Sequence, residues 1–169
     1  MRNRKSDTPG REIDLLTNYP RSDRNVDIRG AEKTEADQAV ARRFGKEFFD
    51  GDRRHGYGGF AYHRRFWQPV VPTFRDYYSL SGESAVLDVG CAKGFMVRDF
   101  KELIPGISVN GIDISEYAIG CAEEGISDAL KVADARELPF DDASFDLVVS
   151  INTIHNLDRE GVVQALGEI

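Results

Sequence analysis

The sequence predicts an α/β fold with a parallel, doubly wound sheet. From residue 84 onward, short apolar runs typical of strands alternate with helical patterns. The first run, Val86-Leu87-Asp88-Val89, leads directly into a glycine-spaced loop that a helical pattern follows. A second run, residues 108–112, is followed by an acid, Asp113. Strands that end in such loops and carboxylates are typical of sheets that bring their backbone close to a nucleotide-like ligand.

The predicted elements of this region follow one another at short intervals. A Pro105-Gly106 turn separates the first helix from the second strand. In chain order, we predict strand 85–89, helix 94–104, strand 108–112, helix 116–124 with Ser115 as its N-cap, strand 130–133, strand 145–151 and a helix from Asp158.

The first half of the chain has a different character. Residues 1–30 are polar and rich in Arg and Asp, which predicts a flexible arm. We expect residues 31–83 to form a helical extension, with one helix over 32–49 from its apolar spacing. The glycine-rich segment 51–59 must be a loop.

An aromatic-rich segment, residues 60–79, completes this extension. We expect it to become helical after Pro69 or Pro72, with Trp67, Phe74 and Tyr78 facing the core. The domain organisation is therefore an arm over 1–30, an extension and candidate lid over 31–83, and a ligand-binding domain over 84–169.

Composition limits the class of protein. The chain of 169 residues is 41% hydrophobic, which suits one ordinary domain, and no stretch approaches the roughly 20 apolar residues of a membrane span. With only two cysteines and a basic N-terminus that lacks the apolar stretch of a secretory signal, we expect a cytoplasmic protein.

The net charge of −7 is distributed unevenly. Residues 1–80 carry a net charge of +4 and residues 81–169 carry −11. The acidic half argues against a nucleic-acid groove. The basic half either meets an anionic substrate or is a solvated face that complements the acidic half.

Four motifs carry a resemblance to a known family: Asp88-Val-Gly-Cys-Ala-Lys-Gly94, Gly111-Ile-Asp113, Ala133-Asp134-Ala135 and Phe145-Asp-Leu-Val-Val-Ser150. In order and spacing they resemble the motifs of class I S-adenosylmethionine-dependent methyltransferases, most of all the small-molecule branch related to ubiquinone-pathway enzymes. The resemblance covers residues 84–169 and implies a Rossmann-like domain. Because a complete domain of this family has seven strands, we expect this chain to be incomplete after its fourth strand.

The resemblance implies S-adenosylmethionine as cofactor and assigns roles to individual residues. Gly90 and Gly94 would let the methionine end approach the loop, Asp113 would accept from the two ribose hydroxyls, and Asp134 would accept from the adenine amino group. Leu138, Pro139 and Phe140 would follow as an apolar wall. The implied cofactor residues are Asp88, Gly90, Cys91, Ala92, Gly94, Asp113, Ile114, Asp134, Ala135 and Asn152.

Some of these assignments have alternatives. Each carboxylate could instead cap a neighbouring turn at a strand end, and Cys91 suits a small apolar filler. Ala92 stands where the family usually has glycine, and alanine is expected to be accommodated if its φ is negative. An NAD-binding domain would need Gly-x-Gly-x-x-Gly, which this loop does not provide.

His155 is the candidate for a catalytic base because it follows the fourth strand, where it would line the acceptor pocket. The alternative is a histidine that bonds to backbone at the strand end. In the glycine-rich loop, His55, Tyr57 and nearby Tyr62 are candidates for a lid or the substrate site, although turn chemistry explains the glycines equally well. We expect no metal site, because the histidines lack neighbouring ligand clusters.

The function expected from these observations is methyl transfer to a small polar molecule. O-methylation is favoured because of His155 and because the chain lacks the motif of amino-methylating DNA enzymes. The alternatives are a catalytically silent fragment that binds the cofactor or a partner and, with less support, an NAD-binding protein. A fourth strand left at the sheet edge would favour self-association or a partner protein.

Overall fold

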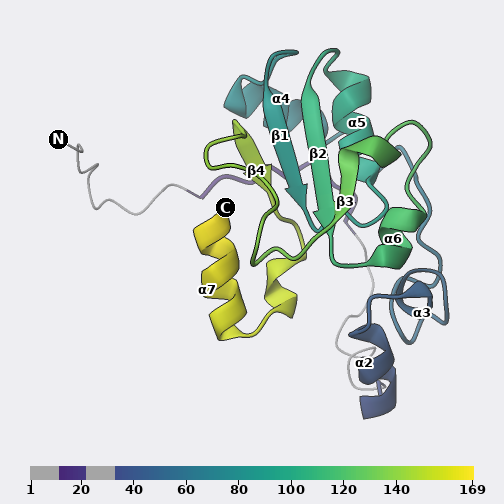
Figure 1. Cartoon of the computed structure of the whole chain (residues 1–169). Helices are drawn as coiled ribbons and strands as arrows, with labels where there is room; N and C mark the ends of the chain where they lie inside the picture. The colour runs from purple at the N-terminus through teal and green to yellow at the C-terminus, as the bar shows by residue number, and fades with distance from the viewer. Residues whose placement is uncertain (1–11, 22–32) are drawn as a thin grey trace.

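A four-stranded parallel sheet forms the centre of the computed structural model, which describes residues 12–21 and 33–169 (Figure 1). The strands are β1 (Ala85–Val89), β2 (Ser108–Asp113), β3 (Leu130–Val132) and β4 (Leu147–Val149), in the order β3-β2-β1-β4. All four expected strands are present, with β3 and β4 shorter than expected. Most of the arm expected over 1–30 lies outside the described residues.

The strand order creates the crevice in which this kind of sheet binds ligands. The chain runs outward from β1 through β2 to β3 and then returns to the other side of β1 as β4. Parallel pairing aligns Asp88 of β1 with Gly111 of β2 and with Val149 of β4. Loops that leave β1 and β4 in opposite directions open a gap at the carboxyl ends of the strands.

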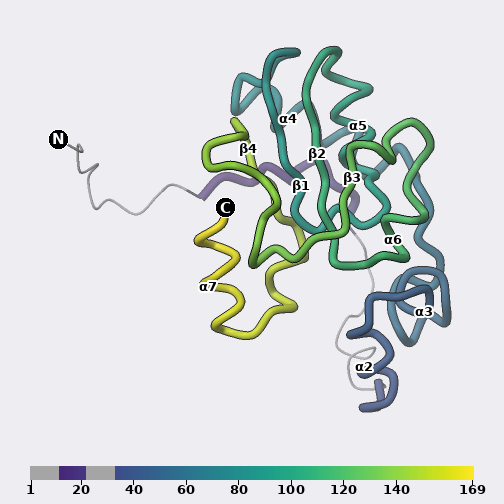
Figure 2. The backbone as a smooth tube through the Cα atoms, in the orientation of Figure 1, coloured from purple at the N-terminus to yellow at the C-terminus, as the bar shows by residue number. Residues whose placement is uncertain are grey.

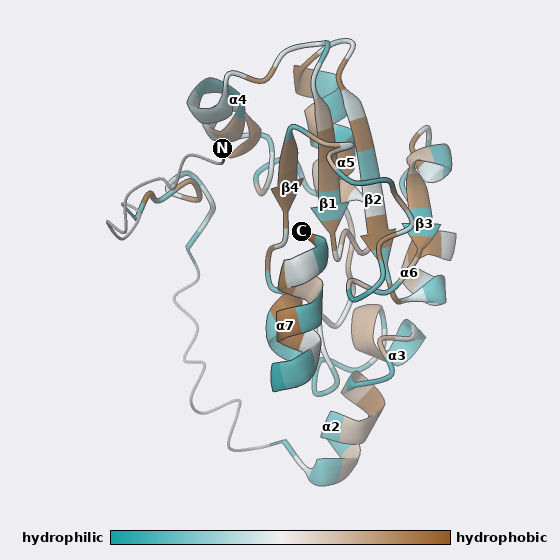
Figure 3. Ribbon diagram, turned by 60° about the vertical axis from the view of Figure 1, so that its left-hand side comes forward, coloured by the Kyte–Doolittle hydropathy of each residue, from teal (hydrophilic) through white to brown (hydrophobic). Residues whose placement is uncertain are grey.

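One face of the sheet is covered by two helices, α4 (Val71–Tyr78) and α5 (Phe95–Leu103). Apolar side chains of both helices pack against β1, β2 and β4 in one continuous core, with Phe100 and Val71 fully buried. Residues 133–146, between β3 and β4, form a loop segment on the other face of the sheet. Figure 3 shows the hydrophobic strands between the two helices and this loop segment. Leu138, Phe140 and Phe145 of that segment pack against Leu87 and Ile112 on the second face.

Shorter elements complete the chain: α6 (Glu116–Gly120), the 3-10 helices η1 (Ser127–Ala129) and η2 (Ile154–Asn156), and α7 (Arg159–Glu168). Ser115 caps α6 as expected, and the Asp158 side chain caps α7 by accepting from the Gly161 amide. α6 ends at Gly120, four residues earlier than expected. No helix of the described chain is long and apolar enough to cross a membrane.

The single helix expected over 32–49 is wrong, because the structure divides it in two. α2 (Glu35–Ala41) and α3 (Lys46–Phe49) are separated at Phe44, whose φ of 47° is left-handed. Tyr78 was expected in the core but is 43% exposed, whereas Phe74 is buried. Figure 2 shows the backbone of α2 and α3 beyond the carboxyl ends of β1 and β2.

Candidate functional site

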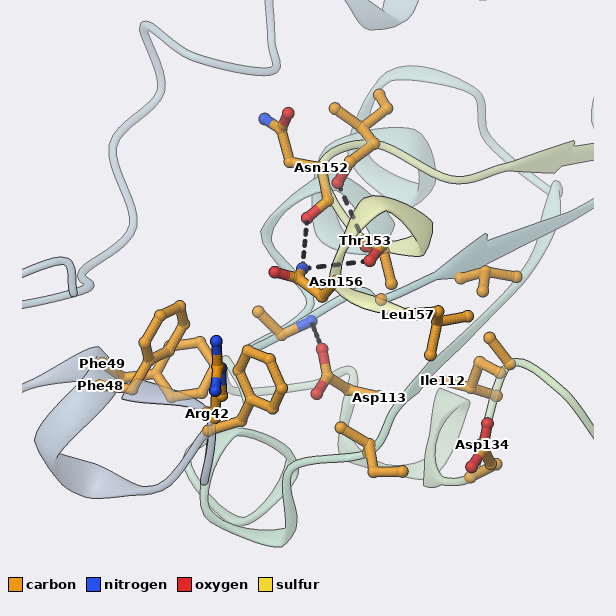
Figure 4. Close-up of a pocket in the computed structure, with 18 of the residues that line it drawn as sticks. Arg42, Phe48, Phe49, Ile112, Asp113, Asp134, Asn152, Thr153, Asn156 and Leu157 are labelled. Atoms are coloured by element: carbon orange, nitrogen blue, oxygen red, sulfur yellow. Dashed lines mark hydrogen bonds between the residues drawn. The ribbon is translucent and has the colours of Figure 1, made fainter. Parts of the chain in front are cut away.

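A cavity of about 340 Å³ lies at the carboxyl ends of the strands (Figure 4). Segments that follow all four strands contribute to its wall, and the N-terminal extension closes it on the side of α3. Its volume falls within the range of small-molecule sites. The lining residues are Arg42, Arg43, Phe44, Phe48, Phe49, Tyr57, Val89, Gly90, Ala92, Ile112, Asp113, Ile114, Ala133, Asp134, Ala135, Arg136, Ile151, Asn152, Thr153, Asn156 and Leu157.

Gly90 begins the loop after β1 and meets the loop after β4. Its φ is 86°, and a Cβ at this position would lie 1.9 Å from the Thr153 Oγ1 atom. Its amide donates to the Ile112 carbonyl of β2 at 2.8 Å. Only glycine therefore lets these two loops approach each other at the floor of the cavity.

Ala92 lies at a φ of 51°, so the negative φ on which its easy accommodation depended is not found. The left-handed conformation brings the Ala92 amide within 2.8 Å of the Asp113 Oδ2 atom. Alanine in this region costs about 1 kcal/mol or more relative to its usual conformation. The loop therefore holds a strained residue at the point where it contacts the carboxylate.

Asp113 is a half-buried carboxylate of the cavity, at the end of β2. Its Oδ1 accepts from the Ser115 amide at 2.8 Å, while Oδ2 accepts from Ala92. Burial raises the pKa of Asp113, and these two amides partly offset that effect. Because each carboxylate oxygen accepts more than one hydrogen bond, both remain able to accept from a ligand's hydroxyl groups.

Asp134 lines the same cavity after β3, but it already has a partner. The Arg136 guanidinium forms a forked contact with it, with Nη2 2.6 Å from Oδ2 and Nε 3.0 Å from Oδ1, which lowers the pKa of Asp134. An amino group that binds Asp134 must therefore share it with Arg136. The neighbouring Ala135 amide has no hydrogen bond within the described chain and lines the cavity, as does Ile114, which is 54% exposed.

Three residues expected at the cofactor lie outside the cavity lining: Asp88, Cys91 and Gly94. Gly94 has a φ of 79° and caps α5, and a Cβ there would meet Ile126 at 2.5 Å, so this glycine serves the packing of helix on sheet. Cys91 is buried against Gly111, and burial raises its thiol pKa, as suits an apolar filler.

Asp88 is 5% exposed, and its side chain has no hydrogen bond within the described chain. Burial, together with the nearby charge of Asp113, raises the pKa of Asp88 to about 7. The expected apolar wall also lies elsewhere. Leu138 and Phe140 cover the second face of the sheet instead of lining the cavity.

The segment after β4 places Asn152 in the cavity but not His155. Asn152 has a φ of 56°, and its carbonyl accepts from the Asn156 side chain (Figure 4). His155 belongs to η2, where it is exposed. In this arrangement the imidazole does not reach the cavity that it was expected to line.

The three residues expected in a lid have different positions. Tyr57 lines the cavity and packs on Phe60 with ring centroids 4.2 Å apart. His55 does not line the cavity and instead contacts α2, with its Nε2 atom 3.3 Å from the Asp37 Oδ1 atom. The Tyr62 hydroxyl donates to buried Asp99 of α5, so Tyr62 anchors the extension to the core.

Sequence reasoning missed the residue that joins the extension to the glycine loop. The Lys93 ammonium is buried and donates to the Asp50 Oδ2 atom and to the Phe60 carbonyl, each at 2.7 Å. The Tyr117 hydroxyl of α6 donates to the same Asp50 oxygen at 2.7 Å. The only available signal was a lysine inside the glycine loop, and nothing in the sequence identified its partner.

The fold and this site define the class of protein. A parallel sheet with this strand order, a glycine loop after β1 and a carboxylate at the end of β2 characterises nucleotide-binding α/β domains. The family model described as "Methyltransferase domain" matches residues 86–169. This segment is therefore a class I S-adenosylmethionine-dependent methyltransferase domain.

Individual relatives agree with this family. A protein named as a methyltransferase from Encephalitozoon cuniculi is 36% identical over 115 residues, which are 68% of this chain and 49% of the relative. A sterol 4-C-methyltransferase from Caenorhabditis elegans is 36% identical over 90 residues, 47% of this chain and 26% of the relative. The chain thus spans about half or less of these relatives' length.

Solved structures show the same fold. The crystal structure of MccD protein is 31% identical and has a TM-score of 0.51, covering 58% of this chain and 45% of its own. The [4+2]-cyclase SpnF, at 23% identity and a TM-score of 0.53, covers 72% of this chain and 44% of its own. Since this fold also occurs in a protein named as a cyclase, the fold alone does not specify methyl transfer.

Proposed function

We propose that this domain binds S-adenosylmethionine in the cavity at the strand ends and transfers its methyl group to a small polar molecule. The observation that carries the proposal is Asp113, a carboxylate that lines the cavity and whose two oxygens are fixed by backbone amides. A pair of adjacent ribose hydroxyls suits such a fixed pair of acceptors.

The other residues of the cavity fit the remaining parts of this cofactor. Ile114 presents an exposed apolar side chain beside Asp113, and the Ala135 amide offers a hydrogen-bond donor for a ring nitrogen. Gly90 keeps the loop after β1 free of side-chain atoms at the floor. Asp134 would accept from the adenine amino group while it keeps part of its contact with Arg136.

When bound, the cofactor supplies an electrophilic methyl group, whose bond to sulfur breaks as a bond to the acceptor forms. The chain's own contribution is to bind the cofactor and the acceptor, to orient them, and to exclude water. Orientation matters most, because an in-line displacement depends on the alignment of the reacting atoms. The aromatic side chains of Phe48 and Tyr57, which line the cavity on the side of the extension, exclude water from it.

The proposal includes O-methylation, for which the 32% identity with a tocopherol O-methyltransferase from Oryza sativa gives limited support. His155 gives none in this arrangement, because it is exposed outside the cavity lining. Self-association is not part of the proposal, although β4 does form one edge of the described sheet.

Calorimetric titration with S-adenosylhomocysteine, with NAD as the comparison ligand, tests the cofactor assignment. We expect S-adenosylhomocysteine to bind and NAD not to bind. The substitution Asp113→Ala removes charged hydrogen bonds to two hydroxyls and should weaken binding by roughly 100-fold, at about 1.5 kcal/mol or more for each bond. The exposed Asp128→Ala is the matched control. If a folded Asp113→Ala protein binds S-adenosylhomocysteine with unchanged affinity, Asp113 does not bind the ribose hydroxyls.

Turnover separates the enzyme from the silent alternative. Both forms should bind S-adenosylhomocysteine, but only the enzyme transfers a labelled methyl group to an added acceptor.

A further inference from the structure

A second, larger cavity of about 910 Å³ lies beside the first. The two cavities share Phe48, Tyr57 and Asn152, so these three side chains stand at the boundary between them. Most of the second cavity's wall comes from the N-terminal extension, which the matched family segment 86–169 does not include. Residues that precede the matched segment therefore determine most of its chemistry.

Aromatic rings make up much of this wall. Seven of its lining residues are aromatic, and several form close pairs. Tyr57 and Phe60 have ring centroids 4.2 Å apart, and Tyr19 packs on Trp67 at 5.0 Å. Flat apolar surfaces of this kind favour a ligand that has a ring of its own, because rings stack on one another in offset or edge-to-face geometry.

The charged residues of the same wall are all cations. Arg21, Lys33, Arg53 and Arg65 line the cavity, and no Asp or Glu of the described chain does so. Arg21, Lys33 and Arg65 form no ion pair within the described chain, whereas neighbouring Arg64 pairs with Glu102 at 2.8 Å. Four cations in a protein of net charge −7 create a local field that favours an anionic ligand.

We propose that this second cavity binds the methyl acceptor, and that the acceptor is a small aromatic molecule that carries an anionic group such as a carboxylate. This inference rests on the proposed function, since the shared boundary residues place the second cavity next to the cavity that we assign to the cofactor. The aromatic wall holds the ring, and the cations hold the anionic group.

Two probes that share a ring system and differ in the charge of one substituent test the inference on the whole chain. Naphthalene-2-carboxylate and naphthalene-2-carboxamide have the same ring system, and titration calorimetry measures the affinity for each. We expect the carboxylate to bind about tenfold more tightly, because charge-assisted hydrogen bonds are about twice as strong as neutral ones. Raising the salt concentration should reduce this preference. Equal affinity of the unsubstituted protein for both probes would overturn the inference.

Arg65→Gln assigns the preference to this cavity, and Arg64→Gln is the matched control because Arg64 pairs with Glu102 outside the cavity. The first variant should lose most of the preference for the carboxylate and the second should keep it. Equal preference in both variants would contradict the location. Binding of S-adenosylhomocysteine, measured in the same samples, reports folding and tests the cofactor site separately. If S-adenosylhomocysteine does not bind but the protein still prefers naphthalene-2-carboxylate over the carboxamide, only the proposed function is contradicted.

Discussion

The substitution Gly90→Ala tests the idea that the loops after β1 and β4 meet without room for a side chain. The added Cβ would lie 1.9 Å from Thr153 Oγ1, 2.4 Å from Cγ2 and 2.6 Å from Cβ. Two costs follow: alanine must adopt the left-handed φ of 86°, and Thr153 must move.

A matched control separates these two costs. Gly125 has a similar φ of 81°, but a Cβ there would have nothing within 4 Å. We expect Gly125→Ala to lower the free energy of unfolding by about 1 kcal/mol, from the backbone conformation alone. Gly90→Ala should lower it by about 3 kcal/mol, because overpacking adds a further 1–3 kcal/mol.

Urea titration gives the free energy of unfolding for each variant. The substitution Thr153→Gly removes the atoms that the new Cβ would meet. In the Thr153→Gly background, Gly90→Ala should cost only about 1 kcal/mol, which corresponds to a coupling of about 2 kcal/mol in a double-mutant cycle. Additive effects of the two substitutions would refute the claim that these loops are in steric contact.

The remaining predictions concern pH. Burial raises the pKa of Asp88 to about 7, so between about pH 4 and pH 7 the folded state keeps a proton that the unfolded chain has lost, and stability falls as pH rises across that window. Asp88→Asn should flatten this part of the stability profile and be the more stable protein at pH 8; parallel profiles would contradict the burial argument. Burial also raises the pKa of Asp50, but hydrogen bonds from Lys93, the Phe60 amide and Tyr117 lower it on balance to about 2. Its contribution, about 1–2 kcal/mol after allowance for partial exposure, should be present above pH 4 and lost between about pH 4 and pH 2. Urea unfolding of the unsubstituted protein and of Asp50→Asn at several pH values measures this effect, and the variant should not lose this part of its stability in acid. An identical loss of stability in both proteins would show that Asp50 contributes nothing.

Sequence reasoning predicted the features that short stretches of chain determine. The apolar runs, the glycine loop and the acid that ends β2 identified the sheet, and all four strands are confirmed. The apolar spacing across 32–49 continues through the break at Phe44, so periodicity could not reveal the left-handed residue that divides the helix.

Features that depend on contacts between distant residues were not predictable in this way. The pairing of Lys93 with Asp50 joins residues 43 positions apart. Gly94 was expected to face a ligand, but Ile126 and Leu130 require the glycine. The exposed position of His155 depends on the turn of η2, which no sequence pattern indicated.

The contact of Lys93 with Asp50 has a consequence for cooperativity. Lys93 lies between Ala92, which lines the first cavity, and Gly94, while Asp50 and Phe60 belong to the extension around the second. The contact therefore joins the wall of the first cavity to the wall of the second. We expect binding in one cavity to change the affinity of the other, and such a change must be equal in both directions.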